Sequence, residues 1–376
     1  MNGIEYVEIR DENTDILGII DTAQSIIWHS VYFGVGDFEI YVAAQPEIID
    51  LLQEGRYVTR IDNNEVGIIE TLQIFDDPIS GTMITASGRF AKSLLDRRLI
   101  YNLSGSVNTA TILRGNVETE VRRIVEANAI SCPFDSRRNI PILALGELAG
   151  LPYVIVDDSG YATQKQVSYS NLLEYTDSLL KEYGLAATVV LDEDAKKLRY
   201  VIYEGADRSI DSHDCYIPIT FSKEFDNLTD SNYYFSAATE KNVALIGGAG
   251  EGLERFYSLL AGNQAGLERR ELWVDAGAVN RKYKDENEVE QTYTDDEYRA
   301  MLDATGRQTL TGFKVEETLQ GTVDVINSGF VYNVDFWLGD VVTMQSNELG
   351  RYINERLDDV LEVQDGDGYK IEVNRN

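Results

Sequence analysis

The sequence predicts a β-rich α+β protein with two similar small β-barrels, an α/β domain between them and a peripheral insertion. Three observations favour this fold class. Apolar and polar residues alternate with a period of two over much of the first ninety residues. Capped segments with helical spacing follow in the middle of the chain. A short motif near the N-terminus is repeated near the C-terminus.

The length of 376 residues predicts two to four domains. The chain holds 22 tyrosines and only 6 prolines, which favours half-buried strands over disordered spacers. From changes in the pattern we expect a first barrel over 1–95, an α/β domain over 96–208, a second barrel over 209–255 and 312–376, and an insertion with one helix over 256–311.

The strands of the first barrel follow from alternation. Phe38, Ile40 and Val42 share one face of a strand whose other face is polar. A short helix over Gln45–Leu52 opens with Pro46. The other strands expected here are Glu5–Ile9, Ile16–Ile20, Ser25–Phe33, Tyr57–Ile61, Val66–Phe75 and Thr82–Ser87.

Helical spacing marks the α/β domain and one later segment. Helices are predicted over Val117–Ala127 and over Asn171–Tyr183, where Asn171 and Glu174 form a capping box. Thr294 and Glu297 begin another helix, predicted to end at Gly306, and the charged stretch Arg281–Gln291 is predicted to be an exposed loop. The later strands expected are Ala187–Leu191, Leu198–Tyr203, Tyr216–Phe221, Asn242–Ile246, Glu271–Val274, Glu316–Ile326, Val331–Trp337, Val341–Met344, Tyr352–Val363 and Tyr369–Val373.

The repeated motif reads G-x-x-V-T, a short turn and N-E-[VL]-G. Its members are Gly55, Val58, Thr59, Asn64, Glu65 and Gly67 in the first copy, and Gly339, Val342, Thr343, Asn347, Glu348 and Gly350 in the second. A long strand, a polar turn and a closing strand follow each copy. The motif predicts a duplicated barrel; the alternative is that two hairpins of a β-rich protein share these residue types. Two barrels per chain give six in a trimer, which can then sit on a six-fold partner.

Composition excludes several classes of function. The net charge of −31 repels phosphate backbones and anionic membranes. Cys132 and Cys215 lie far apart and form neither a zinc motif nor a disulfide framework. The first residues show no signal peptide, and the most apolar run, Ile140–Val156, is interrupted by glycines, a glutamate and a proline. We expect no specific nucleic-acid binding, no membrane insertion and assembly in a reducing cytoplasm.

A glycine-rich turn resembles a dinucleotide-binding loop. The strand from Val243 runs into glycines that end at Gly252, and Asp275 closes a later strand as a ribose-binding acid would. However, Leu253 stands where the third glycine of GxGxxG belongs, and Glu251 would repel a pyrophosphate. The sequence therefore favours a glycine-rich β-turn.

Other reactive residue types form no convincing site. His213 and Cys215 would share one face of a strand, but a loop histidine and a core cysteine explain them better. His29 lies in an aromatic strand and is expected to pack there. The turn at Asp365 lacks the closing glutamate of a calcium loop. The 64 acidic residues leave a lysozyme-like carboxylate pair open, although no cleft-forming motif contains one. We predict no enzyme activity and no catalytic, cofactor-binding or metal-binding residues.

Seven blocks of the sequence carry a resemblance to a known family. The blocks are Gly36-Asp-Phe-Glu-Ile-Tyr, Val66-Gly-Ile-Ile-Glu, Ala86-Ser-Gly-Arg-Phe, Leu94-Leu-Asp-Arg-Arg, Phe221-Ser-Lys-Glu-Phe-Asp-Asn-Leu, Lys241-Asn-Val-Ala-Leu-Ile-Gly-Gly-Ala-Gly-Glu-Gly and Asp335-Phe-Trp-Leu-Gly-Asp-Val-Val-Thr. They resemble the siphophage tail-hub, or tail-associated, protein family. The resemblance runs over nearly the whole chain. Similar hubs occur in the baseplates of contractile tails and in phage-tail-like bacteriocins.

The resemblance implies a homotrimeric structural hub with two tube-forming barrels. Such a hub joins the six-fold tail tube, or a distal-tail ring, to a three-fold spike or tip in the particle tail, and it can contact the tape-measure protein. Two alternatives remain: a tail-associated peptidoglycan hydrolase and a receptor-binding tip protein. Because the chain ends at Asn376, after the last expected strand, we expect wall-degrading activity on another subunit. The acidic excess is expected to line a channel and repel passing DNA.

Overall fold

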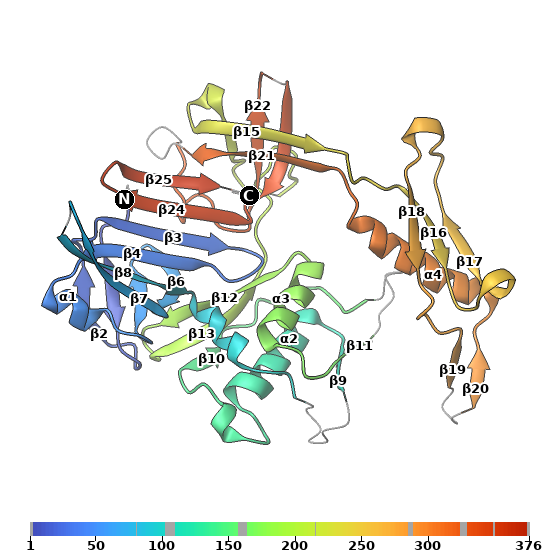
Figure 1. Ribbon diagram of the computed structural model, residues 1–376, viewed down its shortest axis with the longest axis horizontal. Coiled ribbons are helices and arrows are strands. Elements are labelled where there is room, and N and C mark those ends of the chain that lie inside the picture. The colour runs from blue at the N-terminus through green and yellow to red at the C-terminus, as the bar shows by residue number, and fades with distance from the viewer. Residues whose placement is uncertain are drawn as a thin grey trace. The chain divides into compact units, whose positions relative to one another are not determined.

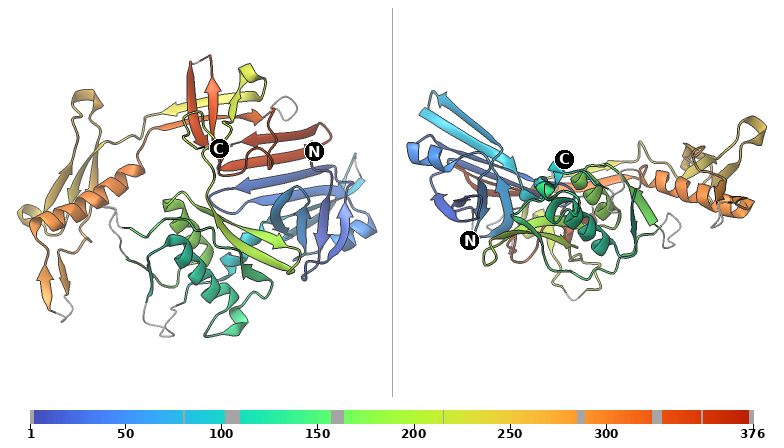
Figure 2. Two further views of the ribbon diagram at one scale, coloured as in Figure 1. Left: turned by 180° about the vertical axis from the view of Figure 1, so that it is seen from behind. Right: turned by 90° about the horizontal axis from the view of Figure 1, so that it is seen from below.

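The computed structural model describes residues 3–79, 81–101, 110–156, 164–214, 216–284, 289–323, 329–348 and 350–373. The chain forms two compact units (Figures 1 and 2). The first unit comprises Met1–Tyr153, Gln166–Asn232 and Leu319–Asn376, and the second comprises Val154–Lys165 and Tyr233–Thr318.

One open antiparallel sheet unites strands from both ends of the chain. In spatial order its eight strands are β15 (Leu228–Ser236), β21 (Glu316–Val323), β25 (Gly368–Val373), β24 (Asp359–Asp365), β3 (Ser25–Val31), β4 (Asp37–Ala43), β8 (Gly81–Arg89) and β7 (Thr71–Asp77). The two halves meet where β24 pairs with β3, from Asp359 opposite Val31 to Gln364 opposite Ile26. Figure 1 shows the C-terminal strands in red beside the N-terminal strands in blue.

The strand order of this sheet repeats. The sheet consists of two sets of four strands. Numbered in chain order, the strands β15, β21, β24 and β25 lie in the spatial order first, second, fourth and third. The strands β3, β4, β7 and β8 lie in the same order. The third strand of one set pairs with the first strand of the next. The two halves are therefore joined head to tail, and β15 and β7 are left as edge strands.

A second sheet covers the core face of the N-terminal strands. Its order is β10 (Leu143–Leu145), β13 (Lys197–Tyr203), β12 (Ala186–Asp192), β6 (Asn63–Ile68), β5 (Tyr57–Arg60), β1 (Val7–Arg10) and β2 (Ile16–Ile20). Trp28, Phe38 and Ile40 from the first sheet pack with Ile9 and Val58 from the second, all at most 1% exposed. The short helix α1 (Pro46–Leu51) has Pro at its first turn, which tolerates the missing N–H.

Two helices cap the α/β part of the first unit. α2 (Val117–Val125) begins at Asn116, whose side chain accepts from the N–H of Thr119, and it continues as a π-helical turn to Ile130. α3 (Leu172–Glu182) begins at Asn171, whose side chain accepts from the N–H of Leu173 and Glu174. The remaining strands of this part and of the C-terminal half are β9 (Thr111–Arg114), β11 (Gln164–Val167), β14 (Thr220–Ser222), β22 (Val341–Ser346) and β23 (Arg351–Arg356).

The second unit is a small sheet with one long helix. The sheet order is β17 (Tyr257–Leu260), β16 (Val243–Gly247) and β18 (Glu271–Asp275), and a separate hairpin is formed by β19 (Lys282–Lys284) and β20 (Glu290–Thr292). α4 (Asp295–Thr311) packs along one side of the sheet (Figure 2) through a core that includes Ile246, Val274, Tyr298 and Leu302.

The β-rich α+β class is confirmed, but the described strands form open sheets and do not confirm two closed barrels. The prediction of a loop over Arg281–Gln291 was wrong, because Lys282 pairs with Glu290 across the β19–β20 hairpin and charge hid the strand pattern. α4 does not end at Gly306: a side chain there would collide with Ile246, so the glycine lets the helix lie close to the sheet.

The predicted strand Val331–Trp337 is a tight turn. The Asp335 carboxylate accepts from the N–H of Val331 at 2.7 Å, and the Asn333 N–H donates to the carbonyl of Phe336 at 2.9 Å. Asn333 has a φ of 62°, a left-handed conformation that asparagine adopts more readily than most residues. Its apolar neighbours line a pocket instead of a strand face.

Candidate functional site

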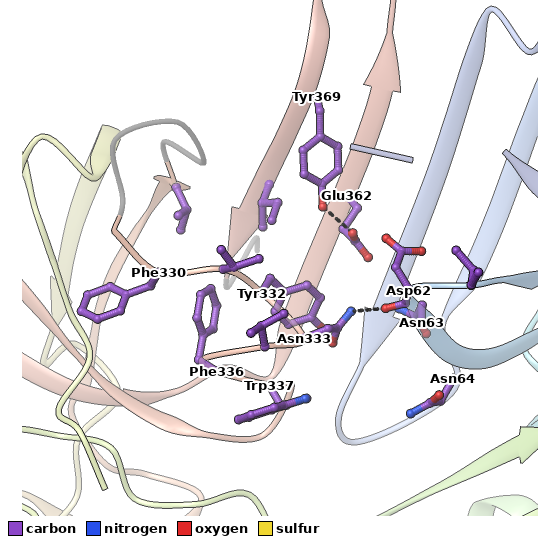
Figure 3. Close-up of a pocket in the computed structure, with 15 residues that line it drawn as sticks. Asp62, Asn63, Asn64, Phe330, Tyr332, Asn333, Phe336, Trp337, Glu362 and Tyr369 are labelled. Carbon is purple, nitrogen blue, oxygen red and sulfur yellow. Dashed lines mark hydrogen bonds between the residues drawn. The ribbon is translucent and has the colours of Figure 1, made fainter. Parts of the chain in front are cut away.

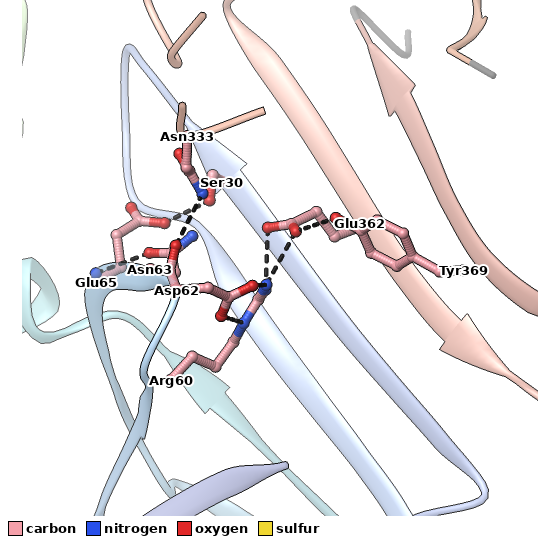
Figure 4. A network of polar contacts seen from close by, with 8 residues as sticks. All are labelled: Ser30, Arg60, Asp62, Asn63, Glu65, Asn333, Glu362 and Tyr369. Carbon is pink, nitrogen blue, oxygen red and sulfur yellow. Dashed lines mark hydrogen bonds and ion pairs between the residues drawn. The ribbon is translucent and has the colours of Figure 1, made fainter. Parts of the chain in front are cut away.

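A buried ion network ties the two halves of the first unit together where β24 meets β3 (Figure 4). Arg60, at the end of β5, donates to both carboxylate oxygens of Glu362 on β24, at 2.9 and 3.0 Å. It also donates to both oxygens of Asp62, at 2.9 and 2.7 Å. Tyr369 on β25 donates its hydroxyl to Glu362 at 2.5 Å. The side chains of Arg60 and Glu362 are 0% and 2% exposed.

The charges of this network are fixed by their partners. Burial alone disfavours a guanidinium charge, yet the carboxylates of Glu362 and Asp62 raise the pKa of Arg60 above its ordinary value. Burial, together with the Glu362 carboxylate, raises the pKa of the Tyr369 hydroxyl, so it stays protonated as a donor. Both carboxylates are thus occupied as hydrogen-bond acceptors of Arg60.

A pocket of about 370 Å³ opens beside this network (Figure 3). One wall is polar and contains Asp62, Asn63, Asn64, Asn333 and Glu362. Asn333 donates to the carbonyl of Asp62 at 3.3 Å and so links the tight turn to the β5–β6 hairpin. The aromatic wall comprises Phe330, Tyr332, Phe336 and Trp337.

The rim of the pocket is apolar and open to solvent. Ile61 is 69% exposed, Val334 63%, and Val331 and Trp337 are each 41% exposed. Contiguous exposed apolar side chains of this kind mark surfaces that another molecule covers. The pocket offers an apolar contact surface, while its carboxylates are engaged with Arg60.

The first copy of the repeated motif surrounds this site. Gly55 precedes β5 with a φ of +81°, Val58 is fully buried, and Thr59 accepts from Arg10 Nε at 2.9 Å. Asn64 lines the pocket. Glu65 on β6 accepts a hydrogen bond from the Ser30 hydroxyl. The last member, Gly67, pairs with Val58, and a side chain there would collide with the Phe38 ring.

The second copy lies on another hairpin. Gly339 precedes β22 with a φ of +93°, and Val342 and Thr343 are fully buried on that strand. Asn347, Glu348 and Gly350 lie in the turn that leads to β23, and Glu348 is exposed. The G-x-x-V-T parts of the two copies thus occupy matching strand starts. The N-E-x-G parts do not match, because the first lies within β6 and the second in a turn.

Both motif hairpins are followed by a hairpin of the shared sheet. β7 and β8 follow β5 and β6, while β24 and β25 follow β22 and β23. Asp77 pairs with Gly81 at the end of the first hairpin, and Asp365 pairs with Gly368 at the end of the second. Counted back from these aspartates, Leu72 corresponds to Val360 and Ile74 to Glu362.

Sequence reasoning predicted one strand over Val66–Phe75, whereas the structure divides it between β6 and β7 and places β7 at a sheet edge. Leu72 and Ile74 are 37% and 52% exposed, whereas the corresponding Val360 and Glu362 are 0% and 1% exposed. Their side chains continue the core face of the sheet, since Leu72 pairs with Ala86 and Ile74 with Ile84. Aligning the two hairpins through their turn aspartates could have revealed the correspondence.

His29 forms a second polar link at the same junction. Its Nε2 lies 2.8 Å from Asp359 Oδ2 on β24, and its Nδ1 lies 3.2 Å from Asp37 Oδ2 on β4. The hydrogen bond to Asp359, opposed by partial burial and supported by Asp37, raises the pKa of His29 to about 9. His29 is therefore a charged clamp between the two halves of the sheet. His213 is exposed, and Cys215 lies outside the described residues.

The glycine-rich turn after β16 differs from a phosphate-binding loop. A single 3-10 turn, Gly252–Glu254, stands where a dinucleotide fold would begin a helix. Asp275 pairs with Arg255. Among the described residues, no group of three or more His, Cys, Asp or Glu side chains is arranged to hold a metal ion. No helix in the described part of the chain is long and apolar enough to cross a membrane.

The fold is that of phage tail proteins. The 43 kDa tail protein of prophage MuSo2 from Shewanella oneidensis matches with a TM-score of 0.59 and 14% identity, over 98% of this chain and 97% of that one. A tail protein from Neisseria meningitidis MC58 matches with a TM-score of 0.59 and 13% identity, over 98% and 95%. Prophage tail protein gp18 from Listeria monocytogenes EGD-e matches with a TM-score of 0.51 and 12% identity, over 99% and 94%.

A family model matches nearly the whole sequence. Residues 6–374 match the model of the Siphovirus ReqiPepy6 Gp37-like protein family, and the chain belongs to that family. Comparison with curated proteins gives no match. The predicted resemblance to siphophage tail proteins is confirmed.

Proposed function

We propose that the protein is a non-catalytic, homotrimeric hub of a phage tail or phage-tail-like particle. The observation that carries this proposal is the head-to-tail repeat of strand order in the eight-stranded sheet, which leaves β7 and β15 as edges. A head-to-tail interface closes into a ring when the rotation per step divides a full turn. The β24–β3 junction inside the chain supplies a template for β7 of one copy pairing with β15 of the next.

The residues at the β7 edge fit this assembly. Leu72 and Ile74 are exposed in one chain but correspond to side chains that are buried at the internal junction. In the repeated motif Met344 occupies the position of Arg60, and Ile74 corresponds to Glu362. In the proposed ring, Met344 of one chain and Ile74 of its neighbour would therefore form an apolar contact where Arg60 and Glu362 form an ion pair. An exposed apolar edge strand is otherwise a site of aggregation.

A ring of three chains would contain six sets of four strands in equivalent positions. Such a ring suits a six-fold tail-tube or distal-tail ring on one side, while its true three-fold symmetry suits a spike or tip on the other. We propose these partners, with the tape-measure protein as a further contact, and a location in the tail after assembly in the bacterial cytoplasm. The domain borders at 95, 208, 255 and 311 belong to this proposal.

The test is the mass of the full chain by sedimentation equilibrium. A species of three times 42.2 kDa is expected. Ile74→Arg should shift it to the monomer, because the new charge would lie in a desolvated strand pairing. Ile16→Arg on β2 is the matched control, since Ile16 is 54% exposed on the edge of the other sheet. A stable dimer, or a trimer unaffected by Ile74→Arg, would contradict the proposed ring.

A further inference from the structure

The small sheet of the second unit has one uncovered face. Ile246 and Val274 face α4, whereas the alternate residues Leu245 and Trp273 point to the opposite side and are 43% and 49% exposed. Tyr257 and Leu259 on β17 join them at 49% and 56% exposure. Leu245 pairs directly with both Leu259 and Trp273, so the four side chains form one continuous patch.

Trp273 is held as a platform within this patch. Its indole lies over Gly247 of the neighbouring strand, where any side chain would collide with the ring and with Arg255. The Arg255 guanidinium lies 5.2 Å from the ring centroid and is itself fixed by the carbonyls of Gly247 and Gly248, at 3.0 and 3.1 Å. Trp273 nevertheless remains 49% exposed.

A donor and an acceptor stand beside the platform. Arg255 Nη2 binds Asp275 Oδ1, which also accepts from the Gly277 N–H at 3.1 Å. Within the described chain, Arg255 Nη1 and Asp275 Oδ2 have no protein partner, and the Asp275 side chain is 66% exposed. The pair therefore offers the two free N–H groups of Nη1 and one free carboxylate oxygen close to an aromatic face.

We propose that this face binds a neutral glycan, with one pyranose ring stacked on Trp273 and adjacent hydroxyls bound to Arg255 and Asp275. Apolar C–H groups of a sugar ring suit an aromatic face, and a hydroxyl both donates and accepts. Tyr257 flanks the indole, with ring centroids 6.3 Å apart and ring planes at 49°. The two aromatic rings therefore form an angled surface that one pyranose ring can contact.

Charge selects against other occupants. Glu251 and Glu254 are exposed and precede Arg255 in the chain, and Glu271 lies on β18 itself. Together with the net charge of −31 they disfavour sulfated, phosphorylated or carboxylated sugars. They equally disfavour the same acidic face of a second copy. The glycan site is independent of the hub role, because all of its residues lie in the second unit.

The experiment is saturation-transfer NMR on the full chain with methyl β-glycosides of glucose, galactose, mannose and N-acetylglucosamine, and with methyl β-glucuronide as the anionic comparison. Saturable binding of at least one neutral glycoside is expected, with a Kd of about 1 mM for a single ring. Trp273→Ala should weaken it by roughly tenfold or more, and Asp275→Ala by a similar factor. Trp337→Ala is the matched control on the first unit, where Trp337 is 41% exposed.

The outcomes are decisive in both directions. No saturable signal from any neutral glycoside at about 50 mM would overturn the site. So would binding that survives Trp273→Ala, or glucuronide binding as tight as that of the glucoside. If Trp273→Ala fails to fold, Asp275→Ala carries the test, because the Asp275 side chain is 66% exposed and contacts only Arg255 and the Gly277 N–H among the described residues. If Trp273→Ala changes the sedimentation of the protein while no neutral glycoside binds, the face is a protein interface and the proposal is rejected.

Discussion

Glu65 illustrates how the surroundings of a side chain change its pKa. It is a member of the repeated motif, and it lies on β6 beside Ser30 of the shared sheet. Burial raises the pKa of its carboxyl to about 7, although the Ser30 hydrogen bond opposes the shift. The residue type was evident from the motif, but its environment was not, because the Ser30 contact depends on how two sheets pack.

Glu65→Gln is expected to stabilise the protein at pH 8. The folded state holds a proton on Glu65 more tightly than the unfolded state, so stability from this group is complete below pH 4.5 and is lost as pH rises through about 7. Glutamine removes that loss, by about 3 kcal/mol at pH 8, and has little effect at pH 4.5. Thermal unfolding at the two pH values measures the difference. Equal shifts at both would show that Glu65 has an ordinary pKa.

His29 predicts a pH dependence at higher pH. The folded pKa of about 9 lies above the model-peptide value of 6.5, so the clamp contributes fully below pH 6.5 and is lost as pH rises through about 9. The contribution is on the order of 1 kcal/mol, because the ring is partly exposed. NMR titration of the two histidines should show one transition near pH 9. His29→Gln should remove it and flatten unfolding stability between pH 6.5 and 9; a His29 titration near 6.5 would contradict the clamp.

At the scale of elements, the β24–β3 junction depends on the pairing of Arg60 with Glu362. Arg60→Ala leaves a buried carboxylate without its cation and is expected to cost about 3–5 kcal/mol of unfolding free energy. The double variant Arg60→Met with Glu362→Leu should recover most of that loss, because no buried charge remains. Chemical denaturation of the single and double variants measures the coupling. Similar losses for both would assign the effect to packing instead of charge.

Most individual elements could be predicted from local pattern. Alternation identified β2 and β4, and capping residues identified the starts of α3 and α4. The failures have different causes. The continuation of α4 past Gly306 depends on its close approach to the distant Ile246, of which the local sequence carries no signal. The turn at Asn333 is held by local hydrogen bonds of Asn333 and Asp335, but the apolar residues around them resemble a strand. The sequence predicted two barrels, which the open sheets of the described strands do not confirm, since sheet edges are defined only by what pairs with them.

At the scale of the whole molecule, the charge of −31 per chain opposes assembly. If three chains form the ring, repulsion between them weakens at higher ionic strength, where the Debye length falls from about 10 Å at 0.1 M to about 3 Å at 1 M. The trimer is therefore expected to dissociate less readily in 1 M than in 0.1 M sodium chloride. Sedimentation velocity at the two salt concentrations measures this. Greater dissociation in high salt would show that ion pairs, and not apolar strand edges, hold the ring.

The head-to-tail order of the two strand sets has one more consequence. Units that repeat in a single direction make a ring whose upper and lower rims are different surfaces, whereas a mirrored arrangement would have made them alike. Such a ring has polarity. If the proposed ring forms, a partner that binds one rim would not find the same surface on the other, so the order in which four strands follow one another in a single chain would set the direction of the particle.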